Sequence, residues 1–327
     1  MHFELKTLQL IEPFRIAHGT SATRQVLRAT NGTLVTEAPF VPYYGEDPAA
    51  TLALLNQTVL PLNLPRTATL ALNLLRHDIV GHQTSRPLSS YAESKLGAPV
   101  HPAPPGCRSF SIPEDLGAFA EKVAAIAAQF PVLKLKLGSG DLGLDIATVS
   151  VARMAAPDAQ LLLDVNGGWD IAEAPLMVEK VSEYSPALIE QPIHHRHGVE
   201  VWEELRTQLP GNAPPIFADE SIQNVGDVEA LADFIDGINI KLLKCGSLDA
   251  AVAMISAAQK QNLQILLGCM IETSLGTTAA AHLAPWADWI DLDGHFYVAN
   301  DDYTGITYDA KGRLIMPERP GIGAIPR

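Results

Sequence analysis

From residue 107 onward, the chain repeats one pattern of hydrophobic and polar positions. A short run rich in Leu, Ile and Val is followed by a polar or glycine-containing turn, and then by an alanine-rich stretch with apolar residues three and four apart. The short runs are typical of buried strands and the longer stretches of amphipathic helices. The strand-like runs are 107–112, 132–138, 160–166, 187–193, 215–221, 237–243, 263–270 and 289–294. Eight strands that alternate with helices predict an α/β fold, a parallel (β/α)8 barrel of the TIM type.

An open, doubly wound sheet is the alternative arrangement of the same elements. Sheets of that kind commonly bind nucleotides through a glycine-rich turn that follows a strand. No G-x-G-x-x-G or G-K-S/T motif follows any of the eight runs, so the sequence favours the barrel.

The two ends of the chain follow other patterns. Residues 1–105 begin with strand-like segments and continue with helical ones, which predicts an N-terminal α+β capping domain. Residues 106–295 contain the eight repeats, and we expect them to form the barrel that carries the functional residues. Residues 296–327 are rich in Gly and Pro with short strand-like runs, and we expect this segment to return to the capping domain.

Composition narrows the classes of function. With 327 residues, 47% of them hydrophobic and 18% charged, the chain is typical of a globular protein with a large core. The net charge of −14 argues against a nucleic-acid partner, because no stripe of Lys and Arg is available to neutralise phosphates. The start MHFELKTLQL lacks the pattern of a signal peptide and no run of 18 apolar residues occurs, so we expect a cytoplasmic protein with no membrane partner.

Three acidic residues, Asp164, Glu190 and Asp219, lie at the ends of three consecutive apolar runs. A charge at the end of such a strand is costly unless it has a partner or a function. In a barrel the carboxyl-terminal ends of the strands meet on one face, where active sites form. Three carboxylates that converge there need a counter-ion, and ligation by oxygen alone suits a hard cation, Mg2+ first.

Lysines flank these acids on both sides in the sequence. Lys134 and Lys136 lie on the second predicted strand and Lys241 on the sixth, which is diametrically opposite in a ring of eight. The eighth strand, opposite the fourth, carries Asp291 and Asp293. A substrate that extends from the metal cluster to this acidic pair therefore has a lysine on each of its two faces, and charge complementarity requires a cation at the end near the pair.

This geometry indicates proton transfer. A substrate carboxylate bound to the metal ion stabilises the negative charge that develops when the neighbouring carbon loses its proton. Lysine acts as a base only with a depressed pKa, which confinement beside other cations provides. A base on each face allows removal of a proton from one side and its return on the other, which inverts the stereocentre.

The motifs at the strand ends resemble those of the enolase superfamily, muconate lactonizing enzyme subgroup. They are the K-x-K of strand 2, the D-x-N of Asp164 and Asn166, the E-Q-P that begins at Glu190, the D-E-S that begins at Asp219 and the I-K-L-L-K-C-G of strand 6. Within the subgroup, GCMIETSLG followed by the D-L-D of Asp291 to Asp293 resembles dipeptide epimerases, in which the acidic pair holds the ammonium of the substrate's N-terminal residue. L-Ala-D/L-Glu epimerases belong to this type.

The resemblance implies roles for the matching positions. Lys136 and Lys241 would be the two acid/base lysines, and Lys134 would support the enolate electrostatically. The Mg2+ ligands would be Asp164, Glu190 and Asp219, and the residues that contact a small-molecule dipeptide substrate would be Asp291, Asp293, Ser111, Cys269 and Ile271.

Other functions remain open from the sequence. A cycloisomerase or an o-succinylbenzoate synthase-like lyase would share the fold and the first proton abstraction but would not require an ammonium anchor. A barrel that binds a metal without turnover is a third reading. The oligomeric state also stays open, with a homo-oligomer as one alternative.

The side chains of the dipeptide are expected to be selected by two cap loops, 13–24 and 41–47, because loops vary while the barrel does not. Relatives that act on Ala-Glu place a cation in the first of these loops. Between Arg15 and Arg24 this chain offers only His18, so both Ala-Glu and a dipeptide with a hydrophobic second residue fit the sequence.

Four further features are read as structural. Lys244, three residues beyond Lys241, is expected to face away from the barrel axis. The histidine-rich segment 194–197 is expected to form a solvated or interface loop rather than a metal tract. His282 and Trp286 fall on one helical face and are expected to pack.

Overall fold

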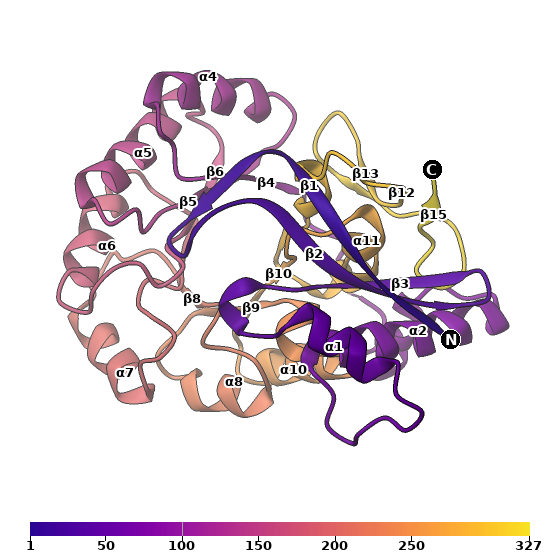
Figure 1. Cartoon of the computed structure of the whole chain (residues 1–327). Coiled ribbons are helices and arrows are strands. Elements are labelled where there is room, and N and C mark those ends of the chain that lie inside the picture. The colour runs from indigo at the N-terminus through magenta and orange to yellow at the C-terminus, as the bar shows by residue number, and fades with distance from the viewer. Residues whose placement is uncertain (100) are drawn as a thin grey trace.

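In residues 1–99 and 101–327, which the computed structural model describes, eight parallel strands form one sheet in sequence order. The strands are β4 (Cys107–Phe110), β5 (Val132–Lys136), β6 (Gln160–Asp164), β7 (Leu188–Glu190), β8 (Ile216–Ala218), β9 (Gly237–Ile240), β10 (Gln264–Gly268) and β11 (Trp289–Asp291). A parallel bridge between Gly106 and Ile290 joins the two outer edges. The sheet therefore closes into the predicted (β/α)8 barrel (Figure 1).

Alternation along the strands fills both sides of the barrel wall. In β6 the side chain of Leu162 belongs to the core inside the barrel, whereas Leu161 and Leu163 pack into the larger core under the helices. The inner core is closed by Cys107, Val132, Leu162, Leu188, Phe217 and Leu266. Gly237 makes room for it, because a Cβ atom at this position would lie 2.3 Å from the Phe217 ring. The carboxyl-terminal strand ends stand on this apolar floor.

Helices surround the barrel (Figure 1). They are α4 (Leu116–Ala127), α5 (Leu142–Ala155), α6 (Ala174–Ser182), α7 (Val199–Gln208), α8 (Val225–Leu231), α10 (Leu248–Lys260) and α11 (Ser274–Ala281). Several begin at a residue whose side chain accepts a hydrogen bond from the first turn, such as Asp115, Asp141 and Ser247. Among the described residues, no helix combines the length and the apolar character needed to cross a membrane.

The N-terminal region forms the predicted cap. Its antiparallel sheet has the order β1 (His2–Ile16), β2 (Gly19–Asn31), β3 (Leu34–Pro39), and the hairpin of β1 and β2 arches across the barrel (Figure 1). Three helices complete the cap: α1 (Pro48–Leu55), α2 (Arg66–Thr84) and α3 (Ser89–Leu96). Helix α2 buries Leu70, Leu74 and Leu75 in the core that the cap shares with the barrel.

The C-terminal segment packs against this cap. It contains two short pairs of strands, β12 (Tyr303–Thr304) with β15 (Ile325–Pro326) and β13 (Thr307–Tyr308) with β14 (Leu314–Ile315). Asp302 accepts hydrogen bonds from Arg28 of β2 at 2.7 and 2.8 Å, and Asp78 of α2 accepts one from the Ile322 amide at 2.7 Å. The boundaries at residues 105 and 295 stay a prediction.

The strands are shorter than the sequence patterns indicate, and one predicted strand continues as a helix. The predicted strand 237–243 ends at Ile240, because residues Leu242–Cys245 turn into a short helix, α9. Lys241 is the residue between the two elements. This difference changes the position of Lys244.

Candidate active site

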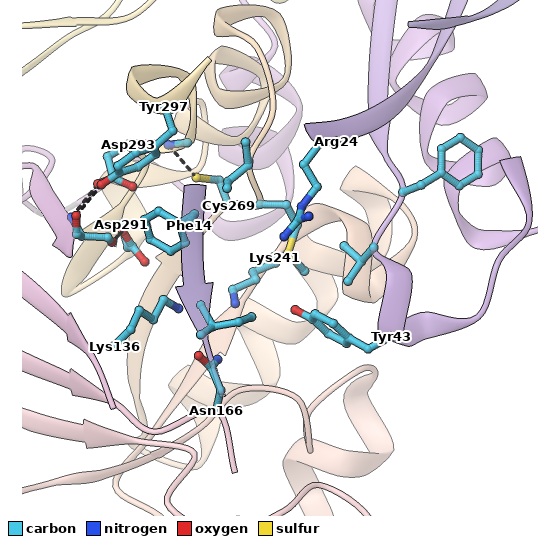
Figure 2. Close-up of a pocket in the computed structure, with 17 residues that line it drawn as sticks. Phe14, Arg24, Tyr43, Lys136, Asn166, Lys241, Cys269, Asp291, Asp293 and Tyr297 are labelled. Carbon is cyan, nitrogen blue, oxygen red and sulfur yellow. Dashed lines mark hydrogen bonds between the residues drawn. The ribbon is translucent and has the colours of Figure 1, made fainter. Parts of the chain in front are cut away.

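A cavity lies between the cap and the carboxyl-terminal ends of the barrel strands (Figure 2). The cap contributes Phe14, Ile16, Arg24, Phe40, Val41 and Tyr43, and the barrel end contributes Ser109, Lys136, Asn166, Lys241, Cys269, Met270, Ile271, Asp291, Asp293, Gly294 and Tyr297. The cap thus contributes mainly apolar side chains to the cavity, and the barrel end contributes most of the charged ones. Six of the predicted site residues line this cavity: Lys136, Lys241, Cys269, Ile271, Asp291 and Asp293.

The three predicted metal ligands come together beneath this cavity. Asp164 ends β6 and lies opposite Glu190, which ends β7, while Asp219 directly follows β8. One carboxylate oxygen of each lies within 4.8 Å of the others, and all three residues are buried. Among the described residues, no other three His, Cys, Asp or Glu side chains come this close together. The strand register places Asp164 beside Glu190, and Asp219 joins them from the residue that follows the next strand.

The donor set of this cluster fits a hard cation. All its atoms are carboxylate oxygens. Glu190 Oε2 and Asp219 Oδ1 are buried and accept no hydrogen bond of good geometry, although a lysine Nζ lies 2.7 Å and 2.5 Å from them. Buried carboxylate oxygens that accept no well-formed hydrogen bond are the kind of ligand that a metal ion can satisfy.

The acids of the cluster differ in pKa because their neighbours differ. Burial and the nearby Asp164 charge raise the pKa of Glu190 to about 8, against the attraction of Lys134. Burial also works to raise the pKa of Asp164, but Lys134 and Lys136 outweigh it and lower that pKa to about 2. Glu190 is thus the acid whose ionised form is least favoured, and a divalent cation bound beside it would favour that form and lower its pKa.

Lys134 connects the acidic cluster to the acidic pair. Its Nζ lies 3.0 Å from Asp164 Oδ2, 2.7 Å from Glu190 Oε2 and 2.8 Å from Asp291 Oδ2, and the side chain is fully buried. Burial alone would lower the pKa of Lys134, but these carboxylates raise it well above its ordinary value. Lys134 is thus a fixed positive charge between the two ends of the site.

Lys136 and Lys241 stand on opposite walls. They belong to β5 and to the end of β9, which are four strands apart in the ring of eight. Figure 2 shows both side chains reaching into the cavity from these different strands. Lys136 Nζ lies 2.5 Å from Asp164 Oδ2, and Lys241 Nζ lies 2.6 Å from Asp219 Oδ2. Each lysine is therefore held beside one of the predicted metal ligands.

Lys244 does not face away from the barrel axis, so that expectation is wrong. Its Nζ is buried, lies 2.5 Å from Asp219 Oδ1 and donates to the Asn239 carbonyl oxygen at 2.7 Å. The reason is local: residues 242–245 form helix α9, and three residues on in a helix bring a side chain back to the same face. Lys244 consequently holds the carboxylate of Asp219, a predicted metal ligand, in place.

Asp291 and Asp293 both line the cavity, but they have different partners. Asp291 accepts a hydrogen bond from Ser109 Oγ at 2.9 Å and from Lys134 Nζ at 2.8 Å. Asp293 accepts from the Ser109 amide at 2.6 Å and from the Tyr297 hydroxyl at 2.7 Å. Burial and the charge of Asp291 raise the pKa of Asp293 to about 6.

Of the three other predicted substrate contacts, Cys269 and Ile271 line the cavity and Ser111 does not. Ser109 takes that place. Strand β4 ends at Phe110, so Ser109 is the residue that projects into the barrel end, whereas Ser111 lies beyond the strand. The placement of Ser111 is corrected accordingly.

Sequence reasoning missed several residues of the site. Asn239 donates to Glu190 Oε1 at 2.6 Å, and a signal for it existed, because it precedes Lys241 by two residues in the predicted strand 237–243. Arg24 enters the cavity from β2, because the predicted cap loop 13–24 is mostly strand and forms the end of the hairpin of β1 and β2. Tyr297 lies in a short 3-10 turn that has no strand pattern, and only its contact with Asp293 reveals it.

His282 and Trp286 are buried as expected, and the role of the histidine-rich segment 194–197 stays a prediction. His194 and His195 stack with ring centroids 4.4 Å apart and are partly exposed. His282 is buried, accepts from the Ser89 amide and contacts the Ile322 carbonyl oxygen at 3.0 Å. Trp286 Nε1 donates to the Gly97 carbonyl oxygen at 3.2 Å.

Comparison with known families agrees with this geometry. Residues 118–327 match the family model described as "Enolase C-terminal domain-like". The chain belongs to this family. The match begins at the third residue of α4 and includes every strand-end acid and lysine described above.

Curated relatives of this member of the enolase C-terminal domain-like family are epimerases. The L-Ala-D/L-amino acid epimerase of Pedosphaera parvula is 38% identical over 216 residues, which cover 65% of this chain and 60% of that protein. The L-Ala-D/L-Glu epimerase of Bacteroides thetaiotaomicron is 31% identical over 260 residues, which cover 79% of this chain and 64% of that protein. The alignments thus span less than two thirds of the relatives' own lengths.

Solved structures of the family match over almost the whole chain. The substrate-liganded L-Ala-D/L-Glu epimerase of Bacillus subtilis has a TM-score of 0.85 at 26% identity, covering 99% of this chain and 98% of that one. The dipeptide epimerase of Enterococcus faecalis, complexed with Mg and the dipeptide L-Leu-L-Tyr, has a TM-score of 0.84 at 27% identity, with the same coverage. Cap, barrel and C-terminal segment are therefore shared.

Proposed function

We propose that the protein is a Mg2+-dependent dipeptide epimerase that inverts the α-carbon of the substrate's C-terminal residue. The observation that carries the proposal is the placement of Lys136 and Lys241 on opposite walls of one cavity. An acidic cluster lies beneath it and an acidic pair lines it. The names of the relatives support the same activity.

Asp164, Glu190 and Asp219 would hold the ion, as their oxygen donors and unsatisfied lone pairs fit Mg2+. When bound, Mg2+ supplies the positive charge that holds the substrate carboxylate and stabilises negative charge at the neighbouring α-carbon. Lys134 adds a second, permanent positive charge at the same place, because its Nζ lies between these acids and Asp291.

Lys136 and Lys241 would move the proton. One lysine, in its neutral form, removes the α-proton from one face, and the other, in its ammonium form, returns a proton to the opposite face. Burial favours the neutral form of Lys241, but the Asp219 carboxylate now raises its pKa well above the ordinary value. Compensation of the Asp219 charge in the loaded site would weaken this attraction and bring the pKa down.

Asp291 and Asp293 would bind the ammonium at the other end of the dipeptide. Both are buried and line the cavity. A requirement for this ammonium-binding site distinguishes a dipeptide epimerase from a cycloisomerase or an o-succinylbenzoate synthase-like lyase, which would not need one. Asp293→Asn tests this more cleanly than Asp291→Asn, because Asp291 also holds Lys134. We expect kcat/KM for a dipeptide to fall about 10- to 100-fold, from the loss of one charged partner.

The control for this experiment is a neutral substrate. An N-acetylated dipeptide has no ammonium group, so its low activity should be the same in wild type and in Asp293→Asn. A variant that processes free dipeptides at the wild-type rate would show that the pair is not an anchor and would favour the lyase reading.

Arg24 indicates which dipeptides fit. It lines the cavity from the cap, and it is half-buried. Its guanidinium donates to the neighbouring Thr23 carbonyl oxygen at 3.2 Å and has no carboxylate partner within residues 1–99 and 101–327. A desolvated guanidinium without an anion attracts one. We therefore propose that the second residue of the preferred dipeptide carries a carboxylate, as in Ala-Glu.

A further inference from the structure

Arg108 lies behind the acidic pair and takes no part in the chemistry proposed above. It belongs to β4, and its guanidinium carbon lies 4.2 Å from the ring centroid of Phe296, 5.5 Å from that of Phe130 and 5.7 Å from that of Tyr297. Its Nε is buried without a hydrogen-bond partner and lies 3.7 Å from Asp293 Oδ2. An arginine held by aromatic rings at this distance acts on the carboxylate through its charge.

The two acids of the pair are compensated unequally. Asp291 is in direct contact with the ammonium of Lys134 at 2.8 Å. Asp293 has no such contact within the described residues, and the cation nearest to it is Arg108 at 3.7 Å. Both hydrogen bonds that Asp293 accepts end on Oδ2, which leaves Oδ1 for a ligand. Asp293 is therefore the acid with charge to offer to a substrate ammonium.

The other titratable groups that face Asp293 are uncharged, apart from Asp291. Burial raises the pKa of the thiols of Cys107 and Cys269 and of the phenols of Tyr297 and Tyr308 well above their ordinary values. Asp291 opposes the ionisation of Asp293, and Lys134 is already engaged with Asp291. Arg108 is the charged group beside Asp293 that favours its ionised form.

We propose that Arg108 is a positioning residue that keeps Asp293 ionised near neutral pH and thereby sets the affinity for the amino end of the substrate. The proposal rests on the proposed dipeptide function. The aromatic rings hold the guanidinium away from direct contact with Asp293. A direct ion pair would occupy the carboxylate oxygens that a substrate ammonium needs. At 3.7 Å the guanidinium favours the charge and leaves Oδ1 accessible.

The pH profile of kcat/KM tests the proposal. The pKa of Asp293 is raised to about 6, so in wild type the KM for a dipeptide should rise as the pH falls through about 6 and Asp293 becomes neutral. The part of the profile in which kcat/KM falls with decreasing pH is called the acidic limb. In Arg108→Met this limb should move to higher pH, since the positive charge that favours ionised Asp293 is lost. When the pKa of Asp293 lies above the assay pH, each further pH unit of separation should lower kcat/KM about tenfold, with kcat largely retained.

Matched variants separate charge from packing. Arg108→Lys keeps the positive charge and should return the limb toward its wild-type position, whereas Arg108→Gln is polar but neutral and should behave like Arg108→Met. Arg206→Met removes an arginine of α7 that pairs with Asp236 on the surface and should leave the profile unchanged. An unmoved limb in folded Arg108→Met and Arg108→Gln would overturn the proposal.

A second measurement does not depend on turnover. The carboxyl 13C resonance of Asp293, assigned by its absence in Asp293→Asn, should titrate at a higher pH in Arg108→Met than in wild type, in the protein without substrate. If this midpoint moves but no dipeptide is epimerised, the electrostatic role of Arg108 stands and the proposed function fails. If dipeptides are epimerised and the midpoint does not move, the role of Arg108 fails alone.

Discussion

At the scale of single residues, the site consists of buried charges that share partners. Lys134 contacts both the acidic cluster and Asp291, while Lys241 and Lys244 contact the two oxygens of Asp219. Removal of one member of such a set leaves another charge unpaired in a buried place.

The two lysines should fail in different ways. Lys136→Ala and Lys241→Ala should each lower the rate of epimerisation by about 10²–10⁴-fold, because each removes one general acid or base. Each variant should still exchange the α-proton of one stereoisomer through its remaining lysine. The measurement is 1H NMR in heavy water with each stereoisomer separately. Full activity in both variants would end the two-base mechanism.

Arg24 should control the choice of the second residue. Arg24→Met should lower kcat/KM for L-Ala-L-Glu about 10- to 100-fold, because the substrate carboxylate loses its charged partner. Activity on L-Ala-L-Leu should be unchanged or higher. Arg15→Met is the matched control, since Arg15 lies on β1 of the same hairpin, outside the cavity lining. Equal losses on both dipeptides would show that Arg24 supports the fold and not the specificity.

The sequence predicted those site residues that follow a regular strand. Asp164 and Glu190 end their strands, and a period of two places them on the inner face. Prediction failed where the chain leaves regular structure. Lys244 turns back because α9 interrupts the strand, and Ser109 replaces Ser111 because β4 ends one residue before the latter. Strand ends are the least certain part of a pattern and also the place where the site forms.

At the scale of elements, the parallel register sets the geometry of the site. Lys136 is the register partner of Asp164, and Asp164 is the register partner of Glu190. Side chains of directly paired residues project to the same side of the sheet, so a base and two metal ligands become neighbours without any long loop. A shift of one residue in β6 would turn Asp164 away from the cavity.

One carboxylate of α10 fastens the cap helices to the barrel. Asp249 accepts hydrogen bonds from Asn73 Nδ2 at 2.6 Å and the Tyr91 hydroxyl at 2.7 Å, and it contacts His77 Nε2 at 2.9 Å. Burial alone would raise the pKa of Asp249, but these hydrogen bonds lower it below its ordinary value. A pKa that is lower in the folded state adds stability at neutral pH, and this stability is lost as the pH falls through the folded-state pKa.

Asp249→Ala should therefore destabilise the junction of cap and barrel by about 1–3 kcal/mol at pH 7, because donors of α2 and α3 lose their acceptor. Thermal unfolding measures the loss, and limited proteolysis should cut the cap helices sooner. The difference from wild type should shrink in strong acid. Glu12→Gln, which removes an exposed partner of Lys122, is the control and should change little. An unaltered melting temperature in Asp249→Ala would contradict the role.

At the scale of the whole molecule, the cavity exists because the cap covers the open end of the barrel. The repeating pattern of strands and helices predicted the barrel, and the strand-rich start predicted the cap. The contacts that join them could not be predicted. Arg28 and Asp302 are 274 residues apart, and no local pattern encodes a partner at that separation. The same holds for the pairing of Arg108 with Asp293.

Metal binding should be visible in the stability of the whole chain. A ligand that binds only the folded state at a hundred times its Kd adds about 2.7 kcal/mol. Mg2+ should therefore raise the melting temperature of wild type, and a chelator should reverse the shift and remove activity. Asp219→Asn should lose most of the shift, whereas Asp236→Asn, on the surface, should retain it. An equal shift in Asp219→Asn would show that the ion binds elsewhere.

The most direct test of the two-lysine epimerase is proton exchange at one carbon. The protein is incubated with Mg2+ and a set of L-Ala-L-X dipeptides in heavy water, and deuterium and diastereomers are followed by NMR and mass spectrometry. We predict deuterium at the α-carbon of the second residue together with the opposite stereoisomer, and neither in the double variant Lys136→Ala, Lys241→Ala. No deuterium at that carbon in any dipeptide would contradict the account.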